Sequence, residues 1–378
     1  MPGRRVSGPV REVMIVAGEA SGDLHGAGLA AALKQRHPGY RLTGMGGAKM
    51  ASAGVEVAER TDETAVMGFV EVLRTVPRHY ALLKAFRRRL ESGAVHCLVT
   101  IDYPGFNLRL AAAARAAGVP VLYYITPQVW AWGADRLPKM AQLITKAAVI
   151  LPFEEELLRS HGIDATFVGH PLLDRAAARS GMAAARASLG VATEARVLAL
   201  FPGSRQQEID RHLDAFVQTA RLLEARLPGL VVLVATAPGV NVPGDRCPYR
   251  QVTESSLAVL RAADAGVCKS GTTTLEAAVA GCPLIVAYRT SSWTHAIARR
   301  VVRIPRIGLV NVVAGREVAR EFVQDGVVPG TMAEAVAPLL VESDARQRML
   351  RDLDDVRLRL GTPGAAARVA DMVAAIVS

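Results

Sequence analysis

Short apolar runs alternate with longer amphipathic segments along most of the chain. The apolar runs predict strands near residues 12–17, 95–101, 119–125, 145–151, 164–168, 196–201, 230–235, 264–269 and 283–287. Helical patterns lie between them, and two more, at 331–360 and 363–377, close the chain. Strands that alternate with helices form parallel sheets, because each helix returns the chain to the edge where the strand began. The pattern therefore predicts an α/β protein built on doubly wound parallel sheets.

A break in this pattern divides the chain at Gly169-His170-Pro171. Small residues dominate from there to Ala185, and the next sheet begins at Val197. The length of 378 residues suits two domains of ordinary size. We expect two sheet domains that face each other across a cleft, and C-terminal helices that pack back across both. The expected ranges are 1–175, 176–345 and 346–378.

The stretch from Ala262 to Arg289 predicts strand, tight turn, helix and strand. Gly271 lets the backbone turn sharply, and the hydroxyls of Ser270 and Thr272 can cap the helix that follows. The N-terminus of that helix presents N–H groups and the positive end of its dipole, which suits a phosphate. Glu276, one turn further, is placed to reach a ribose. A βαβ unit with a well-capped helix and no ligand explains this stretch equally well.

A second turn of the same type, residues 201–205 (Phe-Pro-Gly-Ser-Arg), follows another predicted strand, and a helix begins after it at about Gln206. Two such turns in one half of the chain indicate a nucleotide at the carboxyl edge of a parallel sheet. Arg205 is the clearest candidate for chemistry. A guanidinium that follows Gly203 and Ser204 can bind a diphosphate through two parallel hydrogen bonds.

The first turn of the chain, residues 18–23 (Gly-Glu-Ala-Ser-Gly-Asp), follows the first predicted strand. Its spacing is not the GxGxxG fingerprint of dinucleotide-binding proteins. Glu19 and Asp23 lie at the carboxyl end of a strand and can contact a substrate. Helix capping by Ser21 or Asp23 is the structural alternative. A glycine-rich segment at 44–47 predicts only a tight loop.

Asp102 comes directly after the strand near 95–101 and before Pro104, which restricts the loop. A carboxylate at that position, facing a cleft, is placed to act as a general base. The alternative is an aspartate that caps the turn, and Asn107 is a candidate cap of the next helix. Trp130 and Trp132 lie in one later loop, where they either line an acceptor pocket or pack at the edge of the domain.

Residues 64–90 combine apolar side chains with clustered arginines. The apolar candidates are Val66, Met67, Phe69, Val70 and Leu73. Such a segment suits an amphipathic helix on an anionic lipid surface. A pair of core helices with solvated arginines explains the same residues.

The composition narrows the classes of partner. A net charge of +10 allows nucleic acid, an anionic membrane surface or anionic substrates, and also a basic surface without a partner. Aromatic residues make up only 5%, which weighs against a single-strand nucleic-acid binder. The 4 cysteines show no CxxC spacing, so we expect reduced thiols and no metal cluster. No apolar run has the length of a membrane span or of a signal peptide, which predicts a cytosolic protein.

Nine segments together give the chain a resemblance, over nearly its whole length, to the lipid-A-disaccharide synthase family, in which they occur in the same order. They are AGEASGD (17–23), VMGFVEVL (66–73), IDYPGFN (101–107), VWAW (129–132), LPFE (151–154), FVGHPLLD (167–174), FPGSR (201–205), SGTTTLEA (270–277) and NVVAGRE (311–317).

The resemblance implies a glycosyltransferase of the GT-B type, with two Rossmann-like domains. Family members transfer 2,3-diacylglucosamine from UDP-2,3-diacylglucosamine to 2,3-diacylglucosamine 1-phosphate, with inversion, and form a β-1,6 bond in lipid A synthesis. The reaction takes place at the inner face of the cytoplasmic membrane of Gram-negative bacteria. We therefore expect a peripheral protein on an anionic membrane surface, with no cofactor, no metal and no nucleic-acid partner. The oligomeric state stays undecided, and a homodimer is allowed.

The same resemblance assigns roles to residues. It makes Asp102 the base for the 6-hydroxyl of the acceptor and places Glu19 beside that acceptor. The apolar residues at 66–76 enter the bilayer surface, and Trp130 and Trp132 belong to the acceptor side. On the donor side it assigns contacts with the UDP-sugar to Gly203, Ser204, Arg205, Ser270, Gly271, Thr272, Glu276 and Asn311.

Two other hypotheses stay open at this point. One is a different GT-B enzyme on UDP-N-acetylglucosamine, such as an epimerase or a peptidoglycan-precursor transferase. The other is a basic α/β module that binds nucleic acid without turnover. The apolar segment at 66–76 counts against both, because neither needs exposed apolar residues there.

Overall fold

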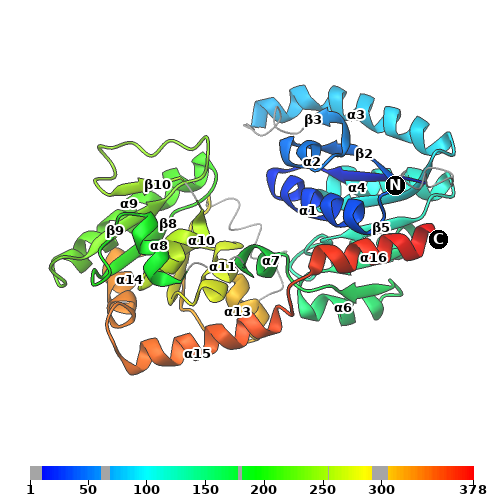
Figure 1. The fold of residues 1–378 in the computed structure, drawn as a ribbon. Coiled ribbons are helices and arrows are strands. Elements are labelled where there is room, and N and C mark those ends of the chain that lie inside the picture. The colour runs from blue at the N-terminus through cyan, green and yellow to red at the C-terminus, as the bar shows by residue number, and fades with distance from the viewer. Residues whose placement is uncertain (1–10, 61–68, 178–180, 254, 292–304) are drawn as a thin grey trace, which may run out of the picture. The chain divides into compact units, whose positions relative to one another are not determined.

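The computed structural model describes residues 11–60, 69–177, 181–253, 255–291 and 305–378, except for the side chains of 59–60 and 69–77 (Figure 1). The chain forms two compact units. Unit 1 comprises residues 1–171 and 362–378, and unit 2 comprises residues 172–361. The chain thus leaves unit 1 at Pro171, builds the whole of unit 2, and returns to unit 1 at Thr362.

Unit 1 is built on a 7-stranded parallel sheet with the strand order β3-β2-β1-β4-β5-β6-β7. Its strands are β1 (Arg11–Ala17), β2 (Tyr40–Gly46), β3 (Glu56–Arg60), β4 (Val95–Ile101), β5 (Val121–Tyr124), β6 (Lys146–Val149) and β7 (Ala165–Phe167). The central strands β1 and β4 are apolar along almost their whole length, because helices cover both faces of the sheet.

The helices of unit 1 are α1 (Ala20–Arg36), α2 (Ala48–Ser52), α3 (Phe69–Glu91), α4 (Pro104–Ala116), α5 (Leu137–Leu143), α6 (Pro152–Arg159) and α16 (Ala365–Val377), with a short 3-10 helix η2 (Ala134–Arg136). On one face of the sheet, α1 and α16 bury Leu29, Leu33, Val369 and Val373. On the other face, α3 and α4 bury an apolar layer that includes Phe86 and Leu110 (Figure 1).

Unit 2 is built on a 6-stranded parallel sheet with the strand order β10-β9-β8-β11-β12-β13. Its strands are β8 (Val197–Phe201), β9 (Val231–Ala235), β10 (Arg250–Val252), β11 (Ala265–Lys269), β12 (Leu284–Tyr288) and β13 (Glu321–Val323). Its helices are α7 (Leu172–Ala177), α8 (Met182–Ser188), α9 (Gln206–Glu224), α10 (Ser256–Ala262), α11 (Thr273–Ala280), α13 (Leu309–Ala314), α14 (Pro329–Val336) and α15 (Asp344–Arg359), with η3 (Gln324–Gly326) and η4 (Ala337–Leu339).

Nine predicted strands are confirmed, with ends that differ by one or two residues. Strands β2, β3, β10 and β13 were missed, because they are short or carry charged and glycine residues. The prediction of a tight loop at 44–47 was wrong for residues 44–46. Residues up to Gly46 belong to β2, because they pair with β1 on one side and β3 on the other.

Candidate functional site

The first group of candidate residues lies where β4 ends, in unit 1. Asp102 and Tyr103 follow the last residue of β4 with φ angles of 46° and 49°, and Pro104 then begins α4. This left-handed conformation costs a residue with a side chain on the order of 1 kcal/mol or more. The loop therefore depends on surrounding groups that hold its backbone in place.

Two buried side chains hold the carbonyl group of Asp102. The side-chain amide of Asn107 donates to that oxygen (2.7 Å) and to the carbonyl of Ile101 (3.2 Å). The hydroxyl of Tyr123 donates to the same oxygen of Asp102 (2.8 Å). The expectation that Asn107 caps the next helix was wrong. Asn107 lies inside α4 and donates backwards, because the strained loop leaves these carbonyl groups to be satisfied.

The surroundings of Asp102 suit a proton acceptor. Burial raises the pKa of this half-buried carboxyl group above its ordinary value, and the negative charge of Glu19 raises it further. Glu19 itself is exposed and directly precedes α1. The fold of unit 1 therefore brings the two predicted carboxylates within electrostatic reach, and a base with a raised pKa binds a proton more strongly.

The two turns that carry Glu19 and Asp102 pack directly against each other. The ring of Tyr103 covers Gly18, where an ideal Cβ atom would lie 2.2 Å from a ring atom. The hydroxyl of Tyr103 lies 2.7 Å from Nε2 of His79 on α3. A side chain at position 18 would therefore have to displace the ring of Tyr103, the residue after Asp102.

Asp23 has a structural role. Its carboxylate accepts the backbone N–H groups of Gly47 (2.7 Å), Lys49 (3.1 Å) and Met50 (3.0 Å). The alternative that Ser21 or Asp23 caps the helix after this turn was wrong, because both residues lie inside α1, and the carboxylate of Asp23 binds the start of α2 instead. That partner is distant in the sequence, which is why it escaped prediction.

Trp130 and Trp132 lie in different environments within the loop after β5. Trp130 donates its indole N–H to Glu154 (3.0 Å) and meets the ring of Phe153 edge to face. Trp132 exposes 45% of its surface, and the guanidinium of Arg136 lies 5.1 Å from its ring centroid. Burial raises the pKa of Glu154 to about 7. Trp130 therefore ties the loop to α6, while Trp132 presents its ring to solvent.

In unit 2, the predicted turn at 201–205 joins β8 to α9, and the predicted helix start at Gln206 is confirmed. Arg205 is exposed at the N-cap position of α9. The backbone N–H of Ser204 donates to the carboxylate of Glu208 (2.9 Å). Gly203 and Ser204 thus bring the chain round so that the guanidinium of Arg205 stands at the start of a helix.

The second turn, residues 270–272, joins β11 to α11. Ser270 donates its hydroxyl to the carbonyl of Ile307 (2.7 Å) and its N–H to the carbonyl of Ala287 (3.2 Å), so its side chain supports the turn. Gly271 has a φ angle of +153°. Thr272 precedes the first turn of α11, in which the N–H groups of Thr274 and Leu275 donate to the carbonyls of Gly271 (3.1 Å) and Thr272 (2.9 Å). The prediction that the hydroxyl of Ser270 or Thr272 caps this helix was wrong, because neither side chain accepts a hydrogen bond from it. The positive end of the helix dipole suits a phosphate at this N-terminus.

Glu276 and Asn311 are both buried and engaged. Glu276 pairs with the guanidinium of Arg175 (3.3 Å). The amide of Asn311 donates to the carbonyl of Ala319 (2.6 Å) and to Glu321 (2.8 Å), and its oxygen accepts the N–H groups of residues 318–319 (2.7 and 2.9 Å). Asn311 therefore fixes a loop, and a direct contact of either residue with a donor stays a prediction.

The predicted membrane segment falls largely outside the description. Val66 and Met67 lie outside the described residues, and so do the side chains of Phe69, Val70 and Leu73, whose backbone belongs to α3. In the described remainder of α3, Tyr80 exposes 72% of its surface beside the exposed arginines 87 and 88. No helix in the described ranges is long and apolar enough to cross a membrane.

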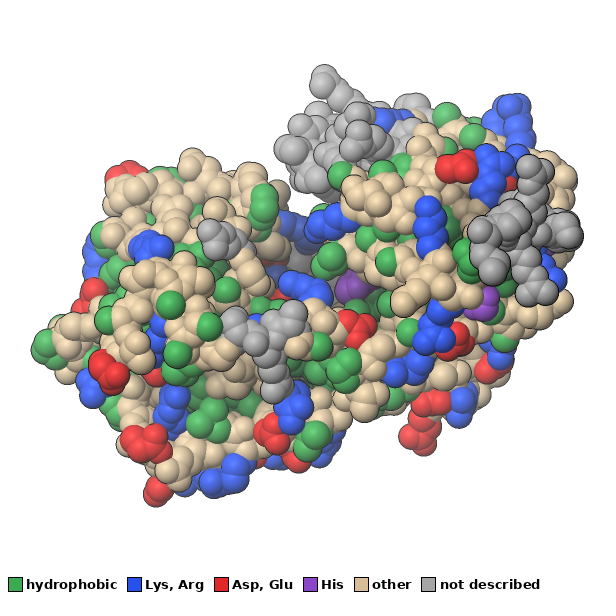
Figure 2. Space-filling model, viewed as in Figure 1, with side chains coloured by type: hydrophobic (Ala, Val, Ile, Leu, Met, Phe, Trp, Pro, Cys, Tyr) green, Lys and Arg blue, Asp and Glu red, His purple; other side chains and the backbone are tan. Residues whose placement is uncertain are grey.

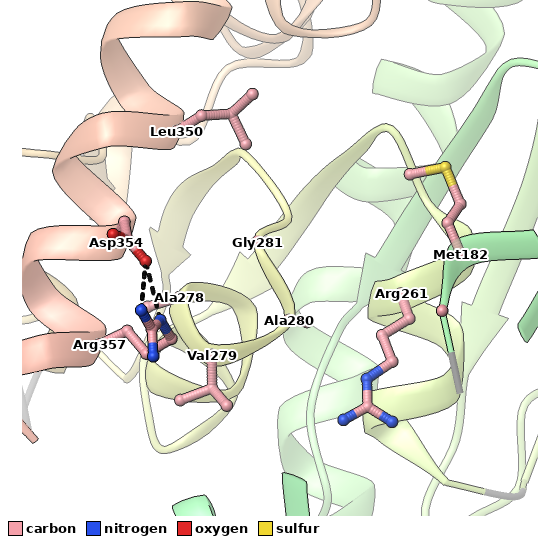
Figure 3. Close-up of a pocket in the computed structure, with 10 residues that line it drawn as sticks. Met182, Arg261, Ala278, Val279, Ala280, Gly281, Leu350, Asp354 and Arg357 are labelled. Carbon is pink, nitrogen blue, oxygen red and sulfur yellow. Dashed lines mark hydrogen bonds and ion pairs between the residues drawn. The ribbon is translucent and has the colours of Figure 1, made fainter. Parts of the chain in front are cut away.

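A hollow of about 370 Å³ in unit 2 lies away from both turns. Figure 3 shows it at the C-terminal end of α11, with Arg261 and Met182 on one side and the ion pair between Asp354 and Arg357 on the other. Among the residues that the structure describes, no three His, Cys, Asp or Glu side chains could hold a metal ion together. Basic and acidic side chains are interspersed on the visible face (Figure 2), which does not form a single basic patch.

Sequence reasoning missed three side chains that organise these turns. Tyr123 lies within an apolar strand, and its only signal was a hydroxyl among buried residues. Glu208 lies one turn into the helix behind Arg205, and Lys269 directly precedes Ser270. Both charged residues are visible in the sequence next to the predicted turns. Their pairing could not be predicted, because it depends on β8 and β11 being neighbours in the sheet.

Comparisons with known proteins agree with this architecture. A sequence model of the family described as lipid-A-disaccharide synthetase matches residues 13–375. The lipid-A-disaccharide synthase of Trichlorobacter lovleyi is 40% identical over 378 residues, which cover 98% of each protein.

Two solved structures show the same fold. The UDP-GlcNAc 2-epimerase from Neisseria meningitidis, bound to UDP-GlcNAc, has a TM-score of 0.65 at 12% identity and covers 96% of this chain and 100% of its own. The calicheamicin glycosyltransferase CalG4 has a TM-score of 0.62 at 18% identity, with 97% and 98% covered. The predicted α/β fold of the GT-B type is confirmed. The family match does not favour an epimerase, a peptidoglycan-precursor transferase or a nucleic-acid-binding module.

Proposed function

We propose the substrates and the chemistry of this chain, which belongs to the lipid-A-disaccharide synthase family and is a glycosyltransferase of lipid A biosynthesis. It transfers 2,3-diacylglucosamine from UDP-2,3-diacylglucosamine to the 6-hydroxyl of 2,3-diacylglucosamine 1-phosphate. The products are a β-1,6-linked disaccharide 1-phosphate and UDP. We assign the acceptor to unit 1 and the UDP-sugar donor to unit 2.

The observation that carries the acceptor assignment is the clamped loop of Asp102. Its backbone is strained, its carbonyl is held by two buried donors, and burial raises the pKa of its carboxyl group. A strained residue that is fixed in this way is typical of a group aimed at a reactant. In the proposed reaction Asp102 takes the proton of the 6-hydroxyl as that oxygen attacks the anomeric carbon. Glu19 lies beside the acceptor, and Trp132 offers it an aromatic surface.

On the donor side, the two turns of unit 2 receive the departing diphosphate. The bond between the anomeric carbon and the diphosphate oxygen breaks with inversion, and the electron pair leaves with UDP. Arg205, at the start of α9, and the positive end of the α11 dipole stabilise the charge that develops there. In this proposal Ser270 and Glu276 support the donor site. Glu19 and Asp102 belong to unit 1 and are not needed for donor binding.

The lipid substrates place the reaction at a membrane surface. We propose that the protein is cytoplasmic and binds peripherally to the inner face of the cytoplasmic membrane through the segment at 66–76. The net charge of +10 and the exposed Tyr80 and arginines of α3 support this proposal. A basic surface with exposed aromatic and apolar groups binds anionic lipid through both charge and burial. A homodimer remains a prediction from the sequence.

A product assay tests this function. In detergent micelles that contain both acylated substrates and EDTA, we expect UDP release and disaccharide formation in equal amounts. EDTA is expected to have no effect, since the proposed groups at both turns are protein donors and cations. Release of UDP without disaccharide would indicate hydrolysis instead of transfer, and turnover that required Mg²⁺ would contradict the proposed charge stabilisation.

The clamp on Asp102 gives a second expectation, for Tyr123→Phe. The variant removes one hydrogen bond to the strained loop and leaves the carboxylate in place. We expect kcat to fall about 5- to 10-fold, the usual worth of one such bond, with the KM of both substrates nearly unchanged. Tyr40→Phe, at the first residue of β2 in the same sheet, is the matched control and should keep full activity. Equal kcat for Tyr123→Phe and wild type would rule out this role for the hydroxyl.

A further inference from the structure

The two donor turns share one carboxylate. Glu208 lies on α9, directly behind the first turn, and the backbone N–H of Ser204 donates to its Oε2 atom (2.9 Å). Gly203 has a φ angle of +148°, and an ideal Cβ atom there would lie 2.4 Å from Cβ of Glu208. The first turn therefore lies directly on the Glu208 side chain, with no room for a larger residue between them.

The other oxygen of the same carboxylate reaches the second turn. The ammonium group of Lys269 lies 2.8 Å from Oε1 of Glu208, and both side chains are largely buried, with 19% and 15% exposed. Lys269 is the last residue of β11 and directly precedes Ser270. Burial alone would raise the pKa of Glu208, but the hydrogen bond and charge of Lys269, with help from Ser204 N–H and Arg205, lower it. The carboxyl group of Glu208 is therefore ionised near neutral pH.

One helical turn further, His212 extends the connection to β12. Its Nδ1–H donates to the carbonyl of Glu208 (2.7 Å), and its Nε2 atom accepts the N–H of Arg289 (2.8 Å), the residue after β12. Burial, and then the charge of Lys269, lower the pKa of His212, which matches a neutral imidazole in this arrangement. Through two residues of one face, α9 thus fixes the carboxyl ends of the adjacent strands β8, β11 and β12.

We infer that Glu208 and Lys269 are positioning residues that hold the two phosphate-binding turns at the spacing of one diphosphate. This inference rests on the proposed donor site. Lys269 also neutralises a largely buried carboxylate that would otherwise repel the diphosphate at close range. A buried charge that loses its partner is far more costly than a pair that is replaced as a whole. Loss of Lys269 alone is therefore the most damaging change, and simultaneous loss of Glu208 relieves part of the damage.

The test is a double-mutant cycle with UDP as the probe. Isothermal titration of UDP compares wild type, Glu208→Gln, Lys269→Met and the double variant. We expect the Kd of UDP to rise about 10-fold or more in Lys269→Met, because the loss of a hydrogen bond to a charged group typically changes an affinity by about that factor. The rise should be smaller in the double variant. The KM of the acceptor should not change, which separates this role from general damage. Asp214→Asn is the matched control: Asp214 also lies on α9, and the substitution breaks its exposed ion pair with Arg246, which lies outside that helix.

Each outcome is decisive. The inference is overturned, with the donor site left intact, if Lys269→Met binds UDP as tightly as wild type. It is also overturned if the double variant raises the Kd of UDP by more than the product of the two single-variant effects. Wild-type protein that does not bind UDP overturns the donor site itself. Should Lys269→Met unfold, Lys269→Arg keeps the charge and lengthens the reach, and is expected to retain UDP binding to within about 5-fold. Loss of binding in a folded Lys269→Arg would mean that the exact ammonium contact, and not the charge, sets the spacing.

Discussion

Asp102→Asn is expected to abolish most of the transferase activity of this chain while leaving its fold intact. A positioned general base contributes about 10²- to 10⁴-fold to the rate, so kcat should fall by about that factor. The amide keeps the shape of the carboxylate, and the hydrogen bonds to the backbone carbonyl of residue 102 from Asn107 and Tyr123 do not involve the side chain. The measurement is kcat and the KM of both substrates in the micelle assay, with thermal unfolding as the control for folding.

The pH dependence gives an independent check on the same base. Asp102 must be ionised to accept a proton, and burial and then Glu19 raise its pKa above the ordinary value. Activity is therefore full above the raised pKa and is lost as the pH falls through it. Glu19→Gln removes a negative charge and should shift the acidic limb of kcat/KM to lower pH. An acidic limb that stays in place in Glu19→Gln, or an Asp102→Asn variant with a raised KM and a nearly normal kcat, would assign Asp102 to acceptor orientation instead.

Arg205→Lys is expected to lower kcat/KM for the UDP-sugar about 100-fold, although it keeps the positive charge. The planar guanidinium can form two parallel hydrogen bonds with a diphosphate, which an ammonium group cannot reproduce, and the loss of one preorganised donor typically has an effect of this size. The measurement is the dependence of the rate on donor concentration at a fixed, saturating acceptor.

Arg211→Lys, an exposed arginine further along α9, is the matched control and should behave as wild type. A small effect of Arg205→Lys, similar to that of Arg211→Lys, would leave only long-range charge as the role of Arg205. A loss of acceptor affinity with normal donor affinity would contradict its assignment to the donor side.

Most of the fold follows from local patterns. The buried strands β1, β4, β8 and β11 are apolar runs bounded by turns, and the glycine and hydroxyl residues at 270–272 mark the start of α11 without reference to any other part of the chain. Strands β3 and β13 lie at the sheet edges and carry charged residues, so their sequence resembles that of a loop. Such strands exist because a neighbouring strand pairs with them, which a local pattern does not contain.

The candidate site also has parts that local sequence predicts and parts that it does not. The turns themselves were predictable, because strand ends and glycines have local signatures, but the expected hydroxyl cap of α11 does not form. The groups that hold the turns were not, because Asp23, Tyr123 and Glu208 act on partners that the sheet order brings close. Asn107 shows how a local rule fails. An asparagine near a helix start is a good candidate for a cap, but the left-handed backbone at 102–103 redirects its amide to the preceding loop.

The last helix, α16, belongs to the core of unit 1, where Val369, Ala370, Val373 and Val377 pack with Leu29 and Leu33 of α1. All residues of unit 2 are synthesised before this helix emerges from the ribosome. Unit 2 therefore has its full sequence available while the apolar face of α1 still lacks its cover. Closure of the unit 1 core therefore waits for the last residues of the chain, and a premature stop after residue 361 would leave all residues of unit 2 present but the core of unit 1 without α16.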